Sequence, residues 1–78
     1  MKDEIMPKTI SGKEVIKFLS KKNFEVYSQK GSHVKMISKE RETKTIVPMH
    51  KEIARSTLHS IFKQAKLSEE EIKELMEE

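Results

Sequence analysis

The side chains best suited to proton transfer in this chain are its histidines, His33, His50 and His59. An imidazole has an ordinary pKa of about 6.5, so it exchanges protons near neutral pH, which no other unperturbed side chain does. His33 follows Lys30, Gly31 and Ser32. The glycine would let a phosphate approach the backbone, and the lysine and serine would donate hydrogen bonds to its oxygens. This segment predicts a small anion site with one acid–base group, or else an exposed strand histidine without a role.

The other two histidines carry weaker predictions. His50 comes just after Pro48, where a loop would bring it to the edge of a predicted sheet as a supporting group. A surface or helix-capping role is the commoner alternative for such a histidine. His59 lies on the flank of a predicted helix, and we assign it no function. The histidines are separated by 17 and 9 residues, which matches no zinc-binding pattern, so we expect no metal site.

The chain has 78 residues and no cysteine, which limits its chemistry. Without thiols there is no disulfide scaffold, no thiolate-bound zinc, no iron–sulfur cluster and no cysteine nucleophile. Its two glycines lie 19 residues apart, so there is no glycine-rich phosphate loop, and we expect no small-molecule cofactor. No apolar run exceeds two residues, so we expect no membrane span and a cytoplasmic protein.

Charge is distributed unevenly along the chain. The first 67 residues carry 15 basic and 7 acidic side chains, a net charge of +8, whereas the last eleven hold six glutamates and one lysine. A basic body is typical of proteins that bind nucleic acid, although a lysine-rich solvated surface would give the same count. Lysines recur at helical spacing and then around the predicted strands: Lys13, Lys17 and Lys21, followed by Lys30, Lys35, Lys44 and Lys51. They predict a cationic track for RNA.

Three segments have the spacing and the caps of helices. The first begins with a capping box of Ser11 and Glu14 and is expected to end near Lys22. The second is expected to begin with Ser56 as its cap and shows an apolar stripe at helical spacing. The third is short and acidic, and it begins with another capping box at Ser68. Acidic residues in its first turn suit the positive end of a helix.

Between the first two helices the apolar period changes to two, which predicts three antiparallel strands. The first strand begins at Phe24, and Lys30-Gly31 is the predicted two-residue turn, with glycine supplying the positive φ. The return strand is expected over residues 32–38. Residues 43–47 are β-branched at four of five positions, which indicates the third strand.

The predicted order is helix, three strands, helix and a short terminal helix. It indicates an α+β fold like the α-β-β-β-α double-stranded-RNA-binding domain, with two helices on one face of a three-stranded antiparallel sheet. We divide the chain into a leader (1–10), this domain (11–67) and an acidic C-terminal helix (68–78). The expected core is Val15, Phe18, Leu19, Phe24, Val26, Val34, Met36, Ile46, Leu58, Ile61 and Phe62. The open face of the sheet is expected to carry Tyr27, Gln29, His33, Lys35 and Thr45.

Several motifs follow one another in a recognisable order: Ser11-Gly12-Lys13-Glu14-Val15, Phe24, Gln29-Lys30-Gly31-Ser32-His33, Val47-Pro48-Met49-His50, Thr57-Leu58 and Ile61-Phe62-Lys63-Gln64-Ala65. Together, from about residue 11 to residue 71, they resemble the HicA toxins, small RNA-cleaving components of type II toxin–antitoxin pairs. The Gly-Ser-His element and the later Pro-x-His are the specific parts. The chain departs from the family at Asn23 and Lys66, which stand at expected helix ends where the family usually has glycine.

The resemblance implies a toxin that arrests growth by cleaving mRNA and is inhibited by a HicB antitoxin. It implies that His33 is the catalytic histidine. His50 is a candidate supporting group if its loop brings it close to His33. The expected phosphate- and RNA-binding residues are Lys30, Gly31, Ser32 and Lys35. We expect the cleavage to need no metal ion, because the 2′-hydroxyl of RNA can attack the adjacent phosphate. The alternatives are a non-catalytic RNA-binding module of the same fold and a protein-interaction domain.

Overall fold

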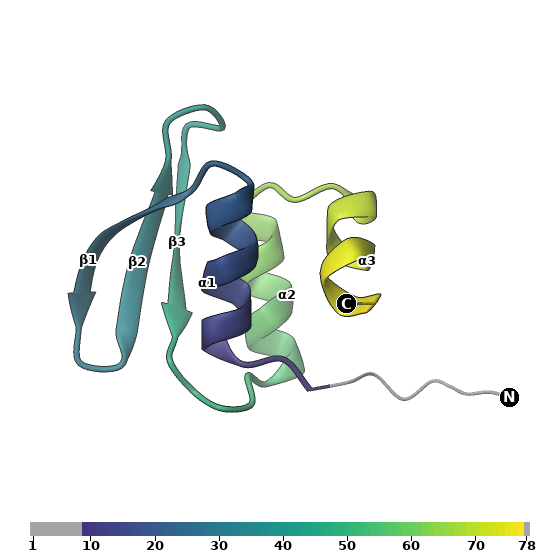
Figure 1. Cartoon of the computed structure of the whole chain (residues 1–78), viewed down its shortest axis with the longest axis horizontal. Helices are drawn as coiled ribbons and strands as arrows, with labels where there is room; N and C mark the ends of the chain where they lie inside the picture. Colours follow the sequence, from purple (N-terminus) through teal and green to yellow (C-terminus); the bar gives the residue numbers. More distant parts are fainter. Residues whose placement is uncertain (1–8, 78) are drawn as a thin grey trace, which may run out of the picture.

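The computed structural model describes residues 9–77, so most of the predicted leader lies outside it. These residues form three helices and a three-stranded antiparallel sheet in the order α-β-β-β-α-α (Figure 1). The elements are α1 (Gly12–Lys21), β1 (Glu25–Lys30), β2 (His33–Ser38), β3 (Thr43–Pro48), α2 (Arg55–Gln64) and α3 (Glu69–Glu77). The predicted α+β class is confirmed. Within residues 9–77, no helix has the length and apolar character needed to cross a membrane.

The predicted capping boxes at the starts of α1 and α3 are both present. The Glu14 amide donates to Ser11 Oγ at 3.1 Å, and the Ser11 amide donates to the Glu14 carboxylate at 2.9 Å. Ser68 and Glu71 make the same pair of bonds at α3. These bonds satisfy amides that have no partner inside a helix. The end of α1 is also as predicted, because Asn23 has φ 69°, a left-handed conformation that stops a helix.

The predicted cap of α2 is wrong. α2 begins at Arg55, and its N-cap is Ala54, which makes no side-chain hydrogen bond, rather than Ser56. The chain is already anchored before it reaches Ser56, because the Ile53 side chain is buried and its amide donates to the Ile10 carbonyl oxygen at 2.9 Å. Ile10 is itself fully buried. Core packing therefore begins within the last residues of the predicted leader.

The turn between β1 and β2 lies one residue later than predicted. Lys30 belongs to β1 and pairs with His33, so the turn consists of Gly31 and Ser32. Gly31 has φ 60° and is the first central residue, a position that favours glycine in hairpin turns. His33 is thereby the first residue of β2, directly at the turn.

A β-bulge in β1 changes which side chains share a face. The register shifts between Val26, which pairs with Met36, and Ser28, which pairs with Lys35. Beyond the bulge, Gln29 pairs with buried Val34, and residues directly opposite share a face of the sheet. Gln29 therefore lies on the helix-covered face, and its predicted place on the open face is wrong.

The alternation along β3 is the reverse of the prediction. Thr45 pairs with buried Met36 and is 2% exposed, whereas Ile46 pairs with Lys35 and is 47% exposed. The predictions of Ile46 in the core and Thr45 on the open face are therefore wrong. Side chains alternate between the two faces of a strand, so Lys44 and Ile46 point to the same side. Because Lys44 is on the side of β3 that faces water, Ile46 is on that side as well.

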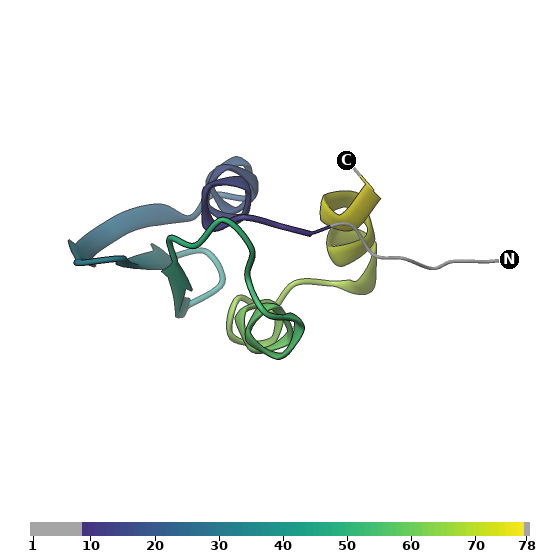
Figure 2. The same ribbon diagram turned by 90° about the horizontal axis from the view of Figure 1, so that it is seen from below.

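Most of the predicted core is confirmed. The buried members are Val15, Phe18, Leu19, Phe24, Val34, Met36, Leu58, Ile61 and Phe62, and they are joined by Ile10, Val47, Ile53, Ala65 and Leu75. α1 and α2 lie side by side over one face of the sheet and enclose this core (Figure 2). Val26 was predicted to be buried but is 54% exposed. It lies in β1, the edge strand that extends beyond the two helices.

The acidic helix α3 packs against the body of the protein on the side of α1 and α2 away from the sheet (Figure 1). Leu75 is its buried anchor. Glu71 accepts two hydrogen bonds from the Arg41 guanidinium, at 2.9 and 2.5 Å, and Glu74 accepts one from Lys22 at 3.2 Å. Two of the C-terminal glutamates therefore attach α3 to cations of the basic body.

Candidate active site

His33 lies at the end of the sheet where the β1–β2 turn meets the end of β3. It pairs with Lys30 on one side and with Pro48 on the other, and its side chain is exposed. A Cβ added to Gly31 would meet no atom within 4 Å, so the positive φ of this turn is what requires glycine there. The turn next to His33 is therefore uncovered at Gly31.

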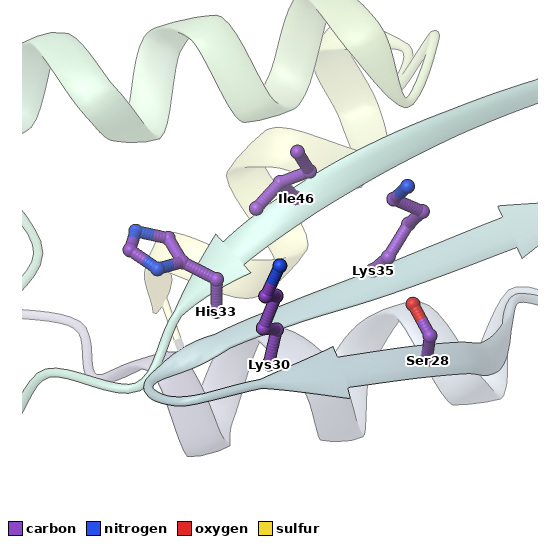
Figure 3. A pocket seen from close by; sticks show the side chains of 5 residues that line it. All are labelled: Ser28, Lys30, His33, Lys35 and Ile46. Atoms are coloured by element: carbon purple, nitrogen blue, oxygen red, sulfur yellow. The ribbon is translucent and has the colours of Figure 1, made fainter.

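One side of the sheet carries a hollow of about 370 Å³ lined by Ser28, Lys30, His33, Lys35 and Ile46. The five side chains come from all three strands and project from the same face (Figure 3). The hollow is accessible and places two ammonium groups on the same face as an imidazole. This arrangement suits a phosphate, because charge-assisted hydrogen bonds from lysine are among the stronger polar contacts.

Two further hollows adjoin the first along β3. One, of about 470 Å³, shares His33 and Ile46 and extends past His50 to the start of α2. The other, of about 310 Å³, shares Lys35 and Ile46 and extends past Lys44 toward the end of α2. Ile46 lines all three hollows. We call this continuous surface the open-face groove.

The structure brings His33 and His50 to the same hollow of the groove, as the predicted supporting role of His50 requires. His59 lines none of the three hollows of the groove. Within residues 9–77, no three histidines, aspartates or glutamates are grouped closely enough to hold a metal ion.

The loop that carries His50 is held by backbone contacts from two directions. The Met49 amide donates to the Ser32 carbonyl oxygen at 2.6 Å, and the Gly12 amide donates to the His50 carbonyl oxygen at 2.9 Å. A Cβ on Gly12 would lie 2.1 Å from the Pro48 carbonyl oxygen, which no side chain can do without moving the backbone. The start of α1, the β3–α2 loop and the β1–β2 turn therefore form one backbone framework around the histidines.

Tyr27 is the aromatic residue of this face, as predicted. The Lys35 Nζ atom lies 5.9 Å from the centre of its ring, a distance at which a cation is attracted to an aromatic face. Tyr27 is 65% exposed, so its ring remains accessible beside the groove. A nucleobase can stack on such a ring.

The sequence reasoning missed several groove residues. Ser28 was missed because the bulge that turns it toward the groove leaves no clear signal in the sequence. Ile46 was misplaced in the core, although its spacing of two from Lys44 was a readable signal. Gly12, which lines no hollow but contacts the loop that carries His50, was read only as part of a capping box. A glycine at the first position of a helix, where alanine would serve better, was a sign of close backbone contact.

The most strongly shifted pKa among the described residues belongs to Glu71, which lines none of the hollows of the groove. The hydrogen bond from Arg41 lowers the pKa of Glu71 to about 2, and the Ser68 amide contributes to the shift. The same interaction raises the pKa of Arg41. This ion pair holds α3, and neither of its residues lines the groove.

Comparison with known protein families matches residues 12–67 to the HicA toxin of bacterial toxin–antitoxin systems. The chain belongs to the HicA toxin family. A comparison with curated proteins found no match. Membership in the HicA family makes the protein a toxin of a toxin–antitoxin pair, and it implies an antitoxin partner.

The HicA family match clarifies two other features of the chain. It ends at Leu67, so α3 lies outside the matched region. Asn23 and Lys66, where the resemblance predicts glycine, have φ 69° and 56°. Both positions keep the left-handed conformation that a glycine would adopt without strain.

Proposed function

We propose that this HicA-family protein is an endoribonuclease that cleaves mRNA, with His33 as the catalytic proton-transfer group. The observation that carries this proposal is the hollow that His33 lines together with Lys30 and Lys35 on an accessible face. A polyanion with a reactive 2′-hydroxyl fits such a site, because lysines neutralise phosphates and an imidazole can act as a general acid or base.

The proposed reaction needs no metal ion. The 2′-oxygen attacks the adjacent phosphorus and forms a bond to it, while the bond from phosphorus to the 5′-oxygen of the next nucleotide breaks. The products are a 2′,3′-cyclic phosphate and a 5′-hydroxyl. Two protons move in this reaction, because the 2′-hydroxyl loses one and the leaving 5′-oxygen gains one. His33 either takes the first proton or gives the second. Lys30 and Lys35 stabilise the negative charge that develops on the phosphate oxygens.

We assign His50 the supporting role in this reaction. It lines a hollow together with His33, so both imidazoles face the same part of the groove. A reaction that removes one proton and delivers another is served by two acid–base groups. Replacement of His50 with alanine is expected to slow cleavage less than replacement of His33.

The proposed partner is a HicB-like antitoxin, and the proposed effect of the free toxin is growth arrest through mRNA cleavage. The family match supports an antitoxin partner in general. The net charge of +8 on residues 1–67 supports an RNA substrate.

The test is incubation of the purified protein with RNA in the presence of a chelator. We expect the wild type and His59→Ala, a matched control outside the groove, to cleave RNA, and His33→Ala to bind RNA without cleaving it. Salt-sensitive binding with no cleavage by the wild type would instead support the non-catalytic RNA-binding module. Cleavage by His33→Ala at the wild-type rate would contradict the assignment of His33.

A further inference from the structure

The hollow between the end of β3 and the start of α2 differs in character from the lysine-lined hollow beside it. Its apolar part consists of Ile46, Pro48, Ile53 and Ala54, and its volume is about 470 Å³. Ile46 is 47% exposed and lies where the three hollows meet. Small-molecule sites commonly combine such an apolar lining with a few polar groups that fix orientation.

The polar groups of this hollow include Glu52 and Thr57. Within the part of the chain that the structure describes, neither side chain forms a hydrogen bond or an ion pair. Glu52 is also the acidic residue that lines the open-face groove, whose other charged groups are Lys30, Lys35 and Lys44. A carboxylate repels phosphate, so its place next to a cationic track favours a part of the ligand that donates hydrogen bonds.

We propose that this hollow binds an unpaired nucleobase of the RNA next to the phosphate at His33, and that Glu52 selects bases with an exocyclic amino group. The inference rests on the proposed function, since it places the base beside the proposed catalytic histidine. The apolar lining contacts the face of the base. The Glu52 carboxylate accepts a hydrogen bond from the amino group of adenine, cytosine or guanine, as carboxylates do when they read bases.

Uracil is the base that this hollow rejects. Its Watson–Crick edge has two carbonyl oxygens on either side of one N–H group, and both oxygens repel a carboxylate. A base without the matching donor leaves the acceptor unpaired, which lowers its affinity relative to the other bases. Specificity in single-stranded RNA is generally read in this way, on the edges of unstacked bases.

The first test measures binding of 5′-AMP, 5′-CMP, 5′-GMP and 5′-UMP by NMR titration of the isotope-labelled wild type. We expect amide shifts at residues 52–57 and an affinity for UMP lower than for the other three, on the order of tenfold. In Glu52→Gln, the side-chain amide donates to a uracil oxygen. The ratio of the affinity for the other three nucleotides to the affinity for UMP is therefore expected to fall to about one. Glu70→Gln, on α3, is the charge-matched control and is expected to keep the wild-type ratio. Equal affinities in the wild type, or an unchanged ratio in Glu52→Gln, would overturn the inference.

The second test compares cleavage of RNA oligonucleotides that differ at one position. We expect the wild type to disfavour uracil next to the cleaved bond and Glu52→Gln to lose this preference. Ile46→Ala is expected to weaken cleavage at all four bases, while Val26→Ala, an exposed apolar control outside the groove, is expected to have no effect. Cleavage with an unchanged preference in Glu52→Gln would refute the base subsite alone. Absence of RNA cleavage by the wild type would refute the proposed nuclease, while the mononucleotide titration would still decide whether the base subsite exists.

Discussion

The two ends of the molecule use their charges in opposite ways. At the α3 end, Arg41 and Lys22 are paired with Glu71 and Glu74. In the open-face groove, Lys30, Lys35 and Lys44 form no ion pair with any residue that the structure describes. Cations that are already paired stabilise the fold, whereas unpaired cations around an accessible hollow are free to bind an anion. The comparison therefore separates the part of the basic surface that holds the protein together from the part proposed to hold RNA.

The largest effect on stability is expected at the backbone framework that supports the groove. In Gly12→Ala, the new Cβ would lie 2.1 Å from the Pro48 carbonyl oxygen, so the start of α1 or the β3–α2 loop must move. We expect unfolding to become easier by about 2–3 kcal/mol, a typical cost of overpacking with backbone displacement. Urea denaturation measures this change. A Gly12→Ala protein as stable as the wild type would show that the close approach does not hold the loop.

The next effect is expected at the α3 end and depends on pH. The folded pKa of Glu71 is about 2, below its ordinary value of 4.5, so ionised Glu71 stabilises the fold at pH values above 4.5. This contribution falls as the pH decreases toward 2. Because the pair is partly exposed, we expect Glu71→Gln to lower the free energy of unfolding at pH 7 by about 1–2 kcal/mol.

Denaturation of both proteins at several pH values measures the contribution of Glu71. The difference between wild type and Glu71→Gln is expected to be constant from pH 7 to about 5 and to shrink at lower pH. Glu69→Gln, in the same turn of α3, is the control. A difference that does not change with pH would mean that Glu71 does not act through its charge.

A smaller effect is expected from each lysine of the groove. Replacement of Lys30 or Lys35 with alanine should weaken RNA binding several-fold and reduce the slope of affinity against salt concentration by about one per lysine. Lys73→Ala on α3 is the matched control and should leave both quantities unchanged. Equal losses from all three variants would mean that RNA binds by overall charge and not in the groove.

The smallest effect is expected at the left-handed residue between α2 and α3. Lys66 has φ 56°, which costs a non-glycine residue free energy, although its ammonium group donates to the Arg41 carbonyl oxygen at 3.2 Å. We expect Lys66→Gly to raise the free energy of unfolding by about 0.5–1 kcal/mol. Thermal denaturation measures it. A loss of stability would mean that the side-chain contact outweighs the backbone strain.

The fold was predictable from the sequence where local rules and packing agree. The two capping boxes, the helical end at Asn23 and most of the core follow from residue types and spacing. The errors at Gln29 and Ile46 arose in strands, where a bulge or a reversed alternation moves every later side chain to the other face. Because Ile46 and Val47 are consecutive and both apolar, either alternation of β3 places one apolar side chain in the core.

The candidate site was predictable only in part. His33, Lys30 and Lys35 were identified because they lie close together around one turn, and the structure brings them to one hollow. Glu52 lies in the β3–α2 loop and Thr57 in α2, and both line the groove because this segment folds back beside β3. Such contacts depend on tertiary structure, which residue spacing along the chain does not report.

The division between the two regions is tested most directly by measuring RNA cleavage and thermal stability together for His33→Ala and Glu71→Gln. We expect His33→Ala to lose cleavage with an unchanged melting temperature. Glu71→Gln is expected to lose about 5–10 °C in melting temperature while it cleaves RNA normally at temperatures where it is folded. Normal cleavage by His33→Ala, or loss of cleavage in folded Glu71→Gln, would contradict the separation of a catalytic groove from a structural α3 end.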